Sequence, residues 1–280
     1  MLHITPVQRF EVVPRGPFDL ETAAAVAVRQ SGDTITGDVH GTGDATGEAA
    51  WQQALATLSL DVDGSGFADV GRRDPVIGRL QAEYNYLRPV LFHSPYEAAC
   101  AFVIGHRITI LQTRRIRQRM AEEFGGTIEV DGTAFHAFPD PQPLLRVEAF
   151  PGVAPVKIER LHHVARAALA GTLDRARLRS LPEPDALTQL RTLPGIGEFF
   201  AQGILMRGAG LVDAVTEDDL TPRAIQLLYR LAYRPEPAAV RKRAEAWRPY
   251  RMWAGVLLNV WVRSQPAEIR GPRQVRRRRK

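Results

Sequence analysis

The chain has 280 residues, 45% of them hydrophobic, which allows one large domain or two to three modest ones. Its single cysteine, Cys100, excludes an intramolecular disulfide framework and a four-cysteine zinc or iron–sulfur site. The formal charge of +6 comes from residues 270–280, which carry seven cationic side chains and no acidic one, so the rest of the chain is close to neutral. Such a tail is either a solvated end or one that also holds nucleic acid through its phosphates.

The sequence carries no export or membrane signal. Its first residues lack a basic stretch followed by an apolar one, and no later segment is an uninterrupted apolar run of about 20 residues. We therefore expect a cytoplasmic protein. Three histidines, His106, His162 and His163, show no metal-ligand spacing with other residues, so neither a metal nor a cofactor is expected.

The first 90 residues or so have the texture of a small α+β domain. Short β-type runs at 10–13, 34–39 and 58–63 are separated by turns rich in Gly and Asp, as in an antiparallel sheet. The stretch 19–30 has a helical composition. We expect this domain to span residues 1–88.

From residue 94 onward the pattern is helical, and two helix starts are marked by capping residues. Ser94 as N-cap, Pro95 at the first helical position and Glu97 three residues after the cap form a capping box. Thr221 followed by Pro222 repeats the start with a cap and a proline. These signals predict helices that begin at both places.

Further helices follow from the spacing of apolar residues, which is helical over 155–170, 185–193 and 249–263. The sequence thus predicts a mostly α protein with a small N-terminal domain that contains an antiparallel sheet. The helical region is expected at 89–268, as two subdomains with a DNA cleft between them. A basic disordered tail is expected at 269–280.

The stretch LPGIG at 193–197 separates two helical segments. Gly195 and Gly197 leave this turn without Cβ atoms, so its backbone can adopt positive φ and approach another molecule closely. Because the second helix begins directly after the turn, several unpaired backbone N–H groups point outward and suit a DNA phosphate. The alternative is a plain turn between two helices.

Two adjacent carboxylates, Asp218 and Asp219, precede the helix that begins at Thr221. A helix N-terminus favours negative charge, so these residues suit either a capping role or an anionic role in catalysis. The sequence leaves open whether Asp218 assists Asp219.

Leu193–Gly197, followed by a helix and Asp219, resembles the helix-hairpin-helix DNA glycosylases. In that superfamily the hairpin grips the DNA backbone and the aspartate cleaves the N-glycosidic bond of a flipped nucleotide. Two more stretches, WRPYR at 247–251 and the segment 74–89, are similar to the branch of the 3-methyladenine DNA glycosylase II type. The resemblance covers most of the chain apart from the Arg-rich tail, and it implies the helical bundle of that superfamily.

The resemblance implies a monofunctional glycosylase that excises damaged, chiefly alkylated, bases from duplex DNA in base excision repair. The base is flipped out, and Asp219 stabilises the positive charge that builds on the sugar or orients the water. Bifunctional members carry a lysine where this chain has Phe199, so no lyase activity is expected. Damaged double-stranded DNA is the implied partner, and we expect a monomer associated with the nucleoid.

The resemblance also assigns DNA-binding residues, which are the five residues of the hairpin and one arginine: Leu193, Pro194, Gly195, Ile196, Gly197 and Arg107. Arg107 either fills the gap left by the flipped base or is an ordinary surface residue. The resemblance places the base pocket at four positions where the family carries aromatic residues: Phe199, Gly203, Leu220 and Asn259. Trp253 is a further candidate, whose ring either replaces the missing ones or belongs to the core. Because most of these positions lack rings, stacking on electron-poor bases is expected to be weak. This favours an alternative, a catalytically weak or inactive relative that binds distorted or damaged DNA, whereas Asp219 favours the enzyme.

Overall fold

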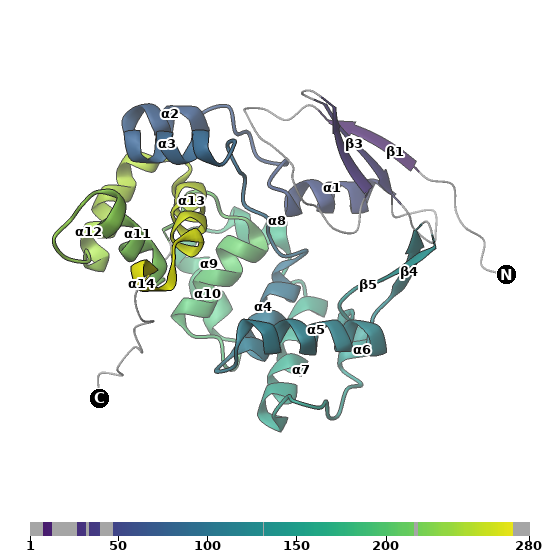
Figure 1. Ribbon diagram of the computed structural model, residues 1–280. Coiled ribbons are helices and arrows are strands. Elements are labelled where there is room, and N and C mark those ends of the chain that lie inside the picture. Colours follow the sequence, from purple (N-terminus) through teal and green to yellow (C-terminus); the bar gives the residue numbers. More distant parts are fainter. Residues whose placement is uncertain are drawn as a thin grey trace, which may run out of the picture. The chain divides into compact units, whose positions relative to one another are not determined.

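The computed structural model describes residues 8–12, 27–31, 34–39, 47–130, 132–215 and 218–270. These residues form two compact units, whose elements are labelled in Figure 1. The first unit consists of the described residues up to Asp61 together with Val90–Leu211. The second consists of Val62–Pro89 and the described residues from Val212 onward.

The first unit contains two small sheets and most of the helices. Its strands are β1 (Gln8–Val12), β2 (Ala27–Ser31), β3 (Thr34–Val39), β4 (Thr127–Val130) and β5 (Thr133–His136). Its helices are α1 (Gly47–Thr57), α4 (Pro95–Gly105), α5 (Ile110–Phe124), α6 (Pro141–Leu144), α7 (Pro155–Leu169), α8 (Arg175–Ser180), α9 (Glu183–Arg191) and α10 (Glu198–Ile204), which continues as the π-helical turn η1 (Leu205–Ala209). The predicted mostly α fold with an antiparallel sheet near the N-terminus is confirmed.

The N-terminal sheet is antiparallel in the order β1-β3-β2, and α1 packs against β3. Trp51 of α1 lies over Gly37, where any side chain would collide with its ring. The strand expected at 58–63 is wrong: the chain turns at Ser59, whose φ of 55° interrupts an extended run. A helix was expected at 19–30, but Ala27–Ser31 forms β2 because its pairing with β3 outweighs local helix propensity. Residues 19–26 lie outside the described residues.

A second hairpin, β4–β5, lies within the region expected to be helical throughout. Nothing in the spacing of apolar residues marks these strands, and in β5 all four side chains are exposed, so no buried face produces a pattern there.

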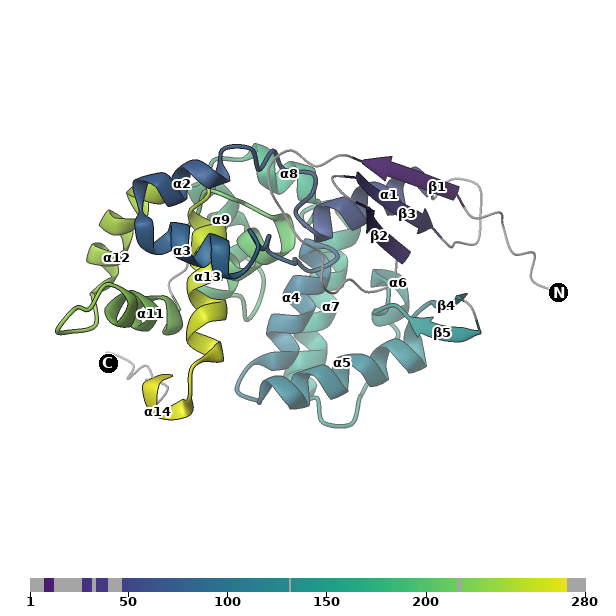
Figure 2. The same cartoon turned by 45° about the horizontal axis from the view of Figure 1, so that its top comes forward.

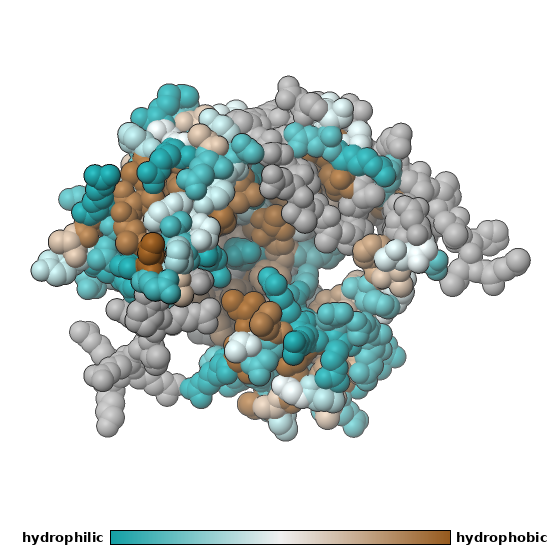
Figure 3. Space-filling model, viewed as in Figure 1, coloured by the Kyte–Doolittle hydropathy of each residue, from teal (hydrophilic) through white to brown (hydrophobic). Residues whose placement is uncertain are grey.

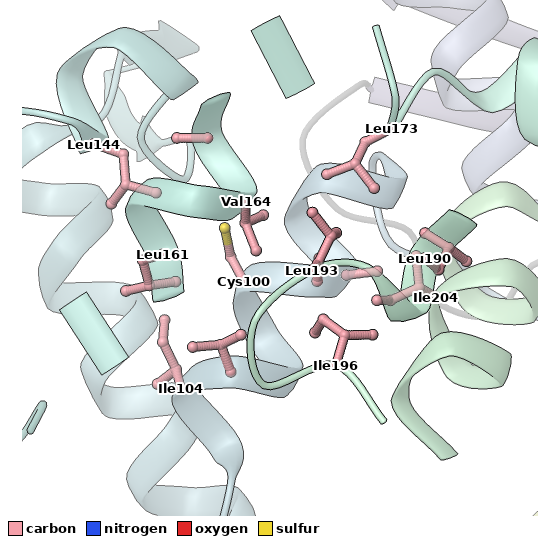
Figure 4. Packing of buried hydrophobic residues seen from close by; sticks show 14 of the residues in the cluster. Cys100, Ile104, Leu144, Leu161, Val164, Leu173, Leu190, Leu193, Ile196 and Ile204 are labelled. Carbon is pink, nitrogen blue, oxygen red and sulfur yellow. The ribbon is translucent and has the colours of Figure 1, made fainter. Parts of the chain in front are cut away.

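Helix α4 is the centre of the first unit's core. Ser94 caps it by accepting from the backbone N–H of Glu97, which confirms the predicted start. Its residues Ala98, Ala99, Cys100 and Ile104 are fully buried and let α7 and η1 approach closely. Figure 2 shows α4 and α7 side by side, and Figure 4 shows the packing around Cys100 and Ile104.

The second unit is helical throughout its described residues. Its elements are α2 (Phe67–Arg73), α3 (Pro75–Glu83), α11 (Leu220–Leu228), α12 (Pro237–Ala244), the 3-10 turn η2 (Glu245–Trp247), α13 (Arg251–Ser264) and α14 (Ala267–Arg270). Residues 269 and 270, expected in the disordered tail, complete α14, and the rest of that tail lies outside the described residues.

A buried carboxylate joins the two stretches that are similar to the glycosylase branch. Asp74 caps α3 by accepting from the N–H of Val76, and its other oxygen accepts from Trp247 Nε1 at 2.8 Å and Tyr229 Oη at 2.5 Å. Because Trp247 and Asp74 are both buried, this contact fixes η2 against the start of α3.

No helix within the described residues is both long and apolar enough to cross a bilayer. The same residues contain no group of three or more His, Cys, Asp and Glu side chains placed to hold a metal ion.

Candidate functional site

The predicted hairpin at 193–197 joins α9 to α10 and is anchored to the core by two of its side chains. Leu193 and Ile196 are buried, and their side chains point into the core beside Leu190 and Ile204 (Figure 4). A hydrogen bond of 3.0 Å from the N–H of Ile196 to the carbonyl of Leu193 closes the turn. The two apolar hairpin residues therefore hold the turn in place, which leaves its other residues to face outward.

The tip of the hairpin is exposed at Pro194, Gly195 and Gly197. Gly195 has a φ of +85°, the left-handed region that favours glycine. Gly197 is different, because its φ of −90° and ψ of −177° suit any residue and a Cβ there would meet no described atom within 4 Å. The backbone N–H groups of Gly195, Gly197 and Glu198 donate to no residue in the described part of the chain.

The turn after α4 contains Arg107, which is exposed and has a φ of +60°. Lys157 of α7 holds this turn, since its Nζ donates to the carbonyls of Ile104 at 2.7 Å and His106 at 2.9 Å. Thr109 then starts α5 with a complete capping box. Arg107, one candidate to fill the gap left by a flipped base, therefore lies on a turn that is held by Lys157 and followed directly by the capped start of α5.

Apolar side chains are exposed beside this turn. Ile110 and Leu111 open α5 and are among the most exposed large hydrophobic residues of the described chain. Figure 3 shows apolar atoms at the surface near the start of α5.

The predicted pocket residues of the first unit lie against an aromatic cluster. Phe199 is 45% exposed, whereas the next residue, Phe200, packs against the rings of Phe102 at 5.2 Å and His106 at 5.7 Å. A side chain at Gly203 would collide with the ring of Phe102, so this ring from α4 occupies the space above the glycine. Phe102 lies about a hundred residues before the hairpin, and sequence reasoning missed it because no local pattern links the two.

The two carboxylates before α11, Asp218 and Asp219, differ in their hydrogen bonding. Asp218 Oδ1 accepts from the backbone N–H groups of Leu220 and Thr221, both at 2.6 Å. Its Oδ2 accepts from Thr221 Oγ1 at 2.9 Å and from Asn259 Nδ2 at 3.1 Å. The side chain of Asp218 therefore caps α11 from the residue before the N-cap position, which is Asp219, and the expectation that Thr221 would be the cap is wrong, since Thr221 lies within α11. The exposed carboxylate of Asp219 makes no hydrogen bond or ion pair with any described residue.

The other pocket candidates of the second unit are committed to the protein itself. Besides Asp218, the amide of Asn259 donates to Thr221 Oγ1 at 2.9 Å and to the carbonyl of Gly255 at 3.1 Å. Trp253 is fully buried against Phe67, with ring centroids 5.2 Å apart. Its assignment to a base pocket is corrected to a core role, because a fully buried ring presents no face to a ligand.

Leu220, the remaining pocket candidate, is half-buried at the first position of α11.

An ion-pair network fixes the chain at Asp213, a few residues before Asp218 and Asp219. Arg251 Nε lies 2.6 Å from Asp213 Oδ1, and its Nη2 donates to the carbonyl of the same residue. Arg248 pairs with the other oxygen of Asp213, and the N–H of Met252 donates to the carbonyl of Val212. Both arginines belong to the WRPYR stretch, so the described contacts explain this stretch structurally; the sequence alone did not indicate Asp213 as its partner.

Comparison with known proteins finds similarity to DNA glycosylases. No family model matches the chain. DNA-3-methyladenine glycosylase 2 of Escherichia coli is 29% identical over 189 residues, which cover 66% of this chain and 63% of that protein. The match thus spans less than two thirds of the relative.

Two solved structures share the fold. A 3-methyladenine DNA glycosylase from Archaeoglobus fulgidus superposes with a TM-score of 0.71 at 22% identity, over 89% of this chain and 86% of that one. An 8-oxoguanine glycosylase/lyase from Clostridium acetobutylicum, bound to double-stranded DNA, gives a TM-score of 0.64 at 18% identity, over 85% and 81%.

A glycine hairpin between two helices, followed by a carboxylate at the start of a later helix, lies on a fold that this chain shares with solved DNA glycosylases. The sequence comparison leads to proteins of the same kind, because the matching relative is a DNA-3-methyladenine glycosylase.

Proposed function

We propose that the protein is a monofunctional DNA glycosylase that flips damaged, chiefly alkylated, bases out of duplex DNA and hydrolyses their N-glycosidic bond with the help of Asp219. The observation that carries this proposal is the contrast between two adjacent carboxylates. Asp218 uses both oxygens within its own turn and on α13, whereas Asp219 is exposed and without a partner in the described chain. Asp219 is therefore available to a reacting molecule.

The chemistry needs an anion more than an acid. Departure of the base builds positive charge on the sugar, and a carboxylate stabilises this oxocarbenium-like state as it does in glycosidases. Alkylated purines already carry positive charge and leave readily, so no general acid is required. One carboxylate, Asp219, is sufficient for this reaction, either by electrostatics or by orienting the attacking water.

The hairpin supports the grip on DNA that flipping needs. Extruding a base from the duplex costs a few kcal/mol, so the enzyme must hold the strand while the base is flipped out. Gly197 supports such a contact, because neither its backbone conformation nor a described neighbour requires glycine there. A closely approaching DNA backbone would require it.

The positions of the lysines support hydrolysis without strand cleavage. The chain has three lysines, Lys157, Lys242 and Lys280, and none in the hairpin or α10. Lys157 is bonded to two carbonyl groups, and Phe199 occupies the position of the Schiff-base lysine in bifunctional members. A lyase step of that type therefore finds no lysine within the hairpin or α10.

A second candidate function rests on the scarcity of exposed rings. Trp253 is buried, Gly203 is covered by Phe102, and Asn259 is bonded to the cap of α11. This arrangement favours a relative that binds damaged DNA with weak or no catalysis.

The test is release of free base from methylated duplex DNA, followed with and without alkali. Asp219→Asn is expected to lower the rate at least about a hundredfold, the loss typical of removing one group that stabilises the transition state. Asp218→Asn is the comparison variant, because asparagine keeps an acceptor for the N–H groups of α11 but loses the oxygen to which Asn259 donates. It is expected to lose much less activity than Asp219→Asn, and strand breaks are expected only after alkali.

Equal losses in both variants would remove the role assigned to Asp219. No release by the wild type from several lesions, with duplex binding retained, would favour the binding protein instead.

A further inference from the structure

We propose that Arg160 on α7 binds a phosphate of duplex DNA beside the hairpin, an inference that rests on the proposed function. The main observation behind this proposal is a close contact between the Arg160 side chain and the hairpin backbone. A Cβ built on Gly195 would lie 2.6 Å from Arg160 Cδ, 2.7 Å from Nε and 3.0 Å from Cζ. The guanidinium group thus lies directly against the exposed tip of the turn.

The charge of Arg160 is not neutralised within the described chain. It makes no ion pair or hydrogen bond there, although it is half-buried. The hairpin's own acidic residue, Glu198, pairs with a different arginine, Arg191, at 3.1 Å. An acceptor for the guanidinium must therefore come from outside these residues.

The neighbouring cation on the same helix differs from Arg160 in this respect. Lys157, three residues earlier on α7, spends its ammonium group on the carbonyls of the turn that carries Arg107. The two positive side chains are close enough for Arg160 to help lower the pKa of Lys157, after burial, which is the larger cause. Helix α7 therefore uses Lys157 to hold the turn that carries Arg107, whereas the charge of Arg160 stays unpaired within the described residues, beside the hairpin.

Phosphate is the acceptor that fits this position. A guanidinium group presents several N–H donors in one plane and binds phosphate through two of them at once, which a lysine cannot do. The N–H groups of Gly195 and Gly197, which are unpaired in the described chain, lie at the same tip. A strand that passes over the hairpin would thus meet neutral donors and one full positive charge.

A purely structural role for Arg160 makes a different prediction. Its methylene groups could simply cover Gly195, as long cationic side chains often do. In that case removing the charge while keeping the stem would leave the salt dependence of DNA binding unchanged. The salt dependence therefore separates the two roles.

The experiment measures the affinity of the protein for a duplex that carries an uncleavable abasic-site analogue, by fluorescence anisotropy at several salt concentrations. Arg160→Gln removes the charge and keeps most of the stem. Arg166→Gln is the matched control, since it makes the same charge change at an exposed position of the same helix. A thermal unfolding curve for each variant establishes that it is folded.

We expect Arg160→Gln to weaken binding about tenfold and to make the slope of log K against log salt shallower by about one. Arg166→Gln keeps the wild-type slope. A wild-type slope for Arg160→Gln, or the same change in both variants, would overturn the assignment. A wild type that binds duplex and releases base while Arg160→Gln behaves normally overturns only this inference, whereas a wild type that binds no duplex overturns the proposed function as well.

Discussion

Asn259 Nδ2 lies 3.1 Å from Asp218 Oδ2, so an amide on α13 holds the carboxylate that caps α11. The same amide bonds to Thr221 and Gly255, which fixes its orientation. Asp219 follows directly in the chain, and its position depends on this cap because Asp218 is bonded to the first N–H groups of the helix.

Asn259→Leu is expected to reduce stability and base release while leaving duplex affinity nearly unchanged. Removal of the donor takes one hydrogen bond away from a charged acceptor, which costs about 2 kcal/mol of unfolding free energy. Denaturant unfolding and single-turnover base release measure the two effects. Gln265→Leu, which removes an amide bonded at the end of the same helix, is the control and should not slow base release. Normal base release by Asn259→Leu would mean that the cap does not position Asp219.

The two hairpin glycines are expected to respond in opposite ways to alanine. Gly195→Ala forces a side chain into the left-handed region and against Arg160, so we expect about 1 kcal/mol of destabilisation. Gly197→Ala meets neither obstacle and should unfold like the wild type, yet bind duplex more weakly. Thermal unfolding and anisotropy distinguish the two. Wild-type affinity in Gly197→Ala would argue against close approach of DNA at that residue.

Two arginines on one carboxylate provide a third test. Arg251 is 12% exposed and Arg248 is 49% exposed, and both pair with Asp213. Arg251→Met should lower the unfolding free energy by about 3 kcal/mol, because a largely buried partner is lost. Arg248→Met should cost less than about 1 kcal/mol, because its pair is screened by solvent. Equal losses in chemical denaturation would mean that burial does not set the strength of these pairs.

The pH dependence of stability is expected to reflect Lys157. Burial, and then Arg160, lower the pKa of this ammonium below its ordinary value of 10.5. Between the lowered pKa and 10.5 the unfolded chain binds more protons than the folded one, so this group's contribution to stability rises with pH. The stability of the wild type relative to Lys157→Met should therefore increase as pH rises toward 10.5, in a series of denaturant titrations. A difference that stays flat or falls over that interval would contradict the shift.

Features encoded by neighbouring residues could be predicted from the sequence. The cap at Ser94 needs only the residues that follow it, and Pro155–Leu169 forms α7 within one residue of the expected range because its apolar spacing is regular. The hairpin of Gly195 and Gly197 was recognisable for the same reason: a turn's chemistry is local.

Contacts between distant residues could not be predicted in this way. Phe102 covers Gly203, and Trp247 donates to Asp74, across about 100 and 173 residues of chain. Each contact depends on how helices pack, which no local pattern encodes. Even for Asp218, adjacent to Asp219, the sequence leaves a capping role and an anionic role open, because the amide that completes its hydrogen bonds lies 41 residues later.

The burial of Cys100 has a consequence for the chemical survival of the protein. Alkylating agents react with thiolates, and the thiol of Cys100 is fully enclosed in α4's core, where burial raises its pKa. The reagents that methylate DNA bases therefore reach the only sulfhydryl group of the chain when the fold opens. Loss of this thiol during exposure to a methylating agent would accordingly report on unfolding of the first unit.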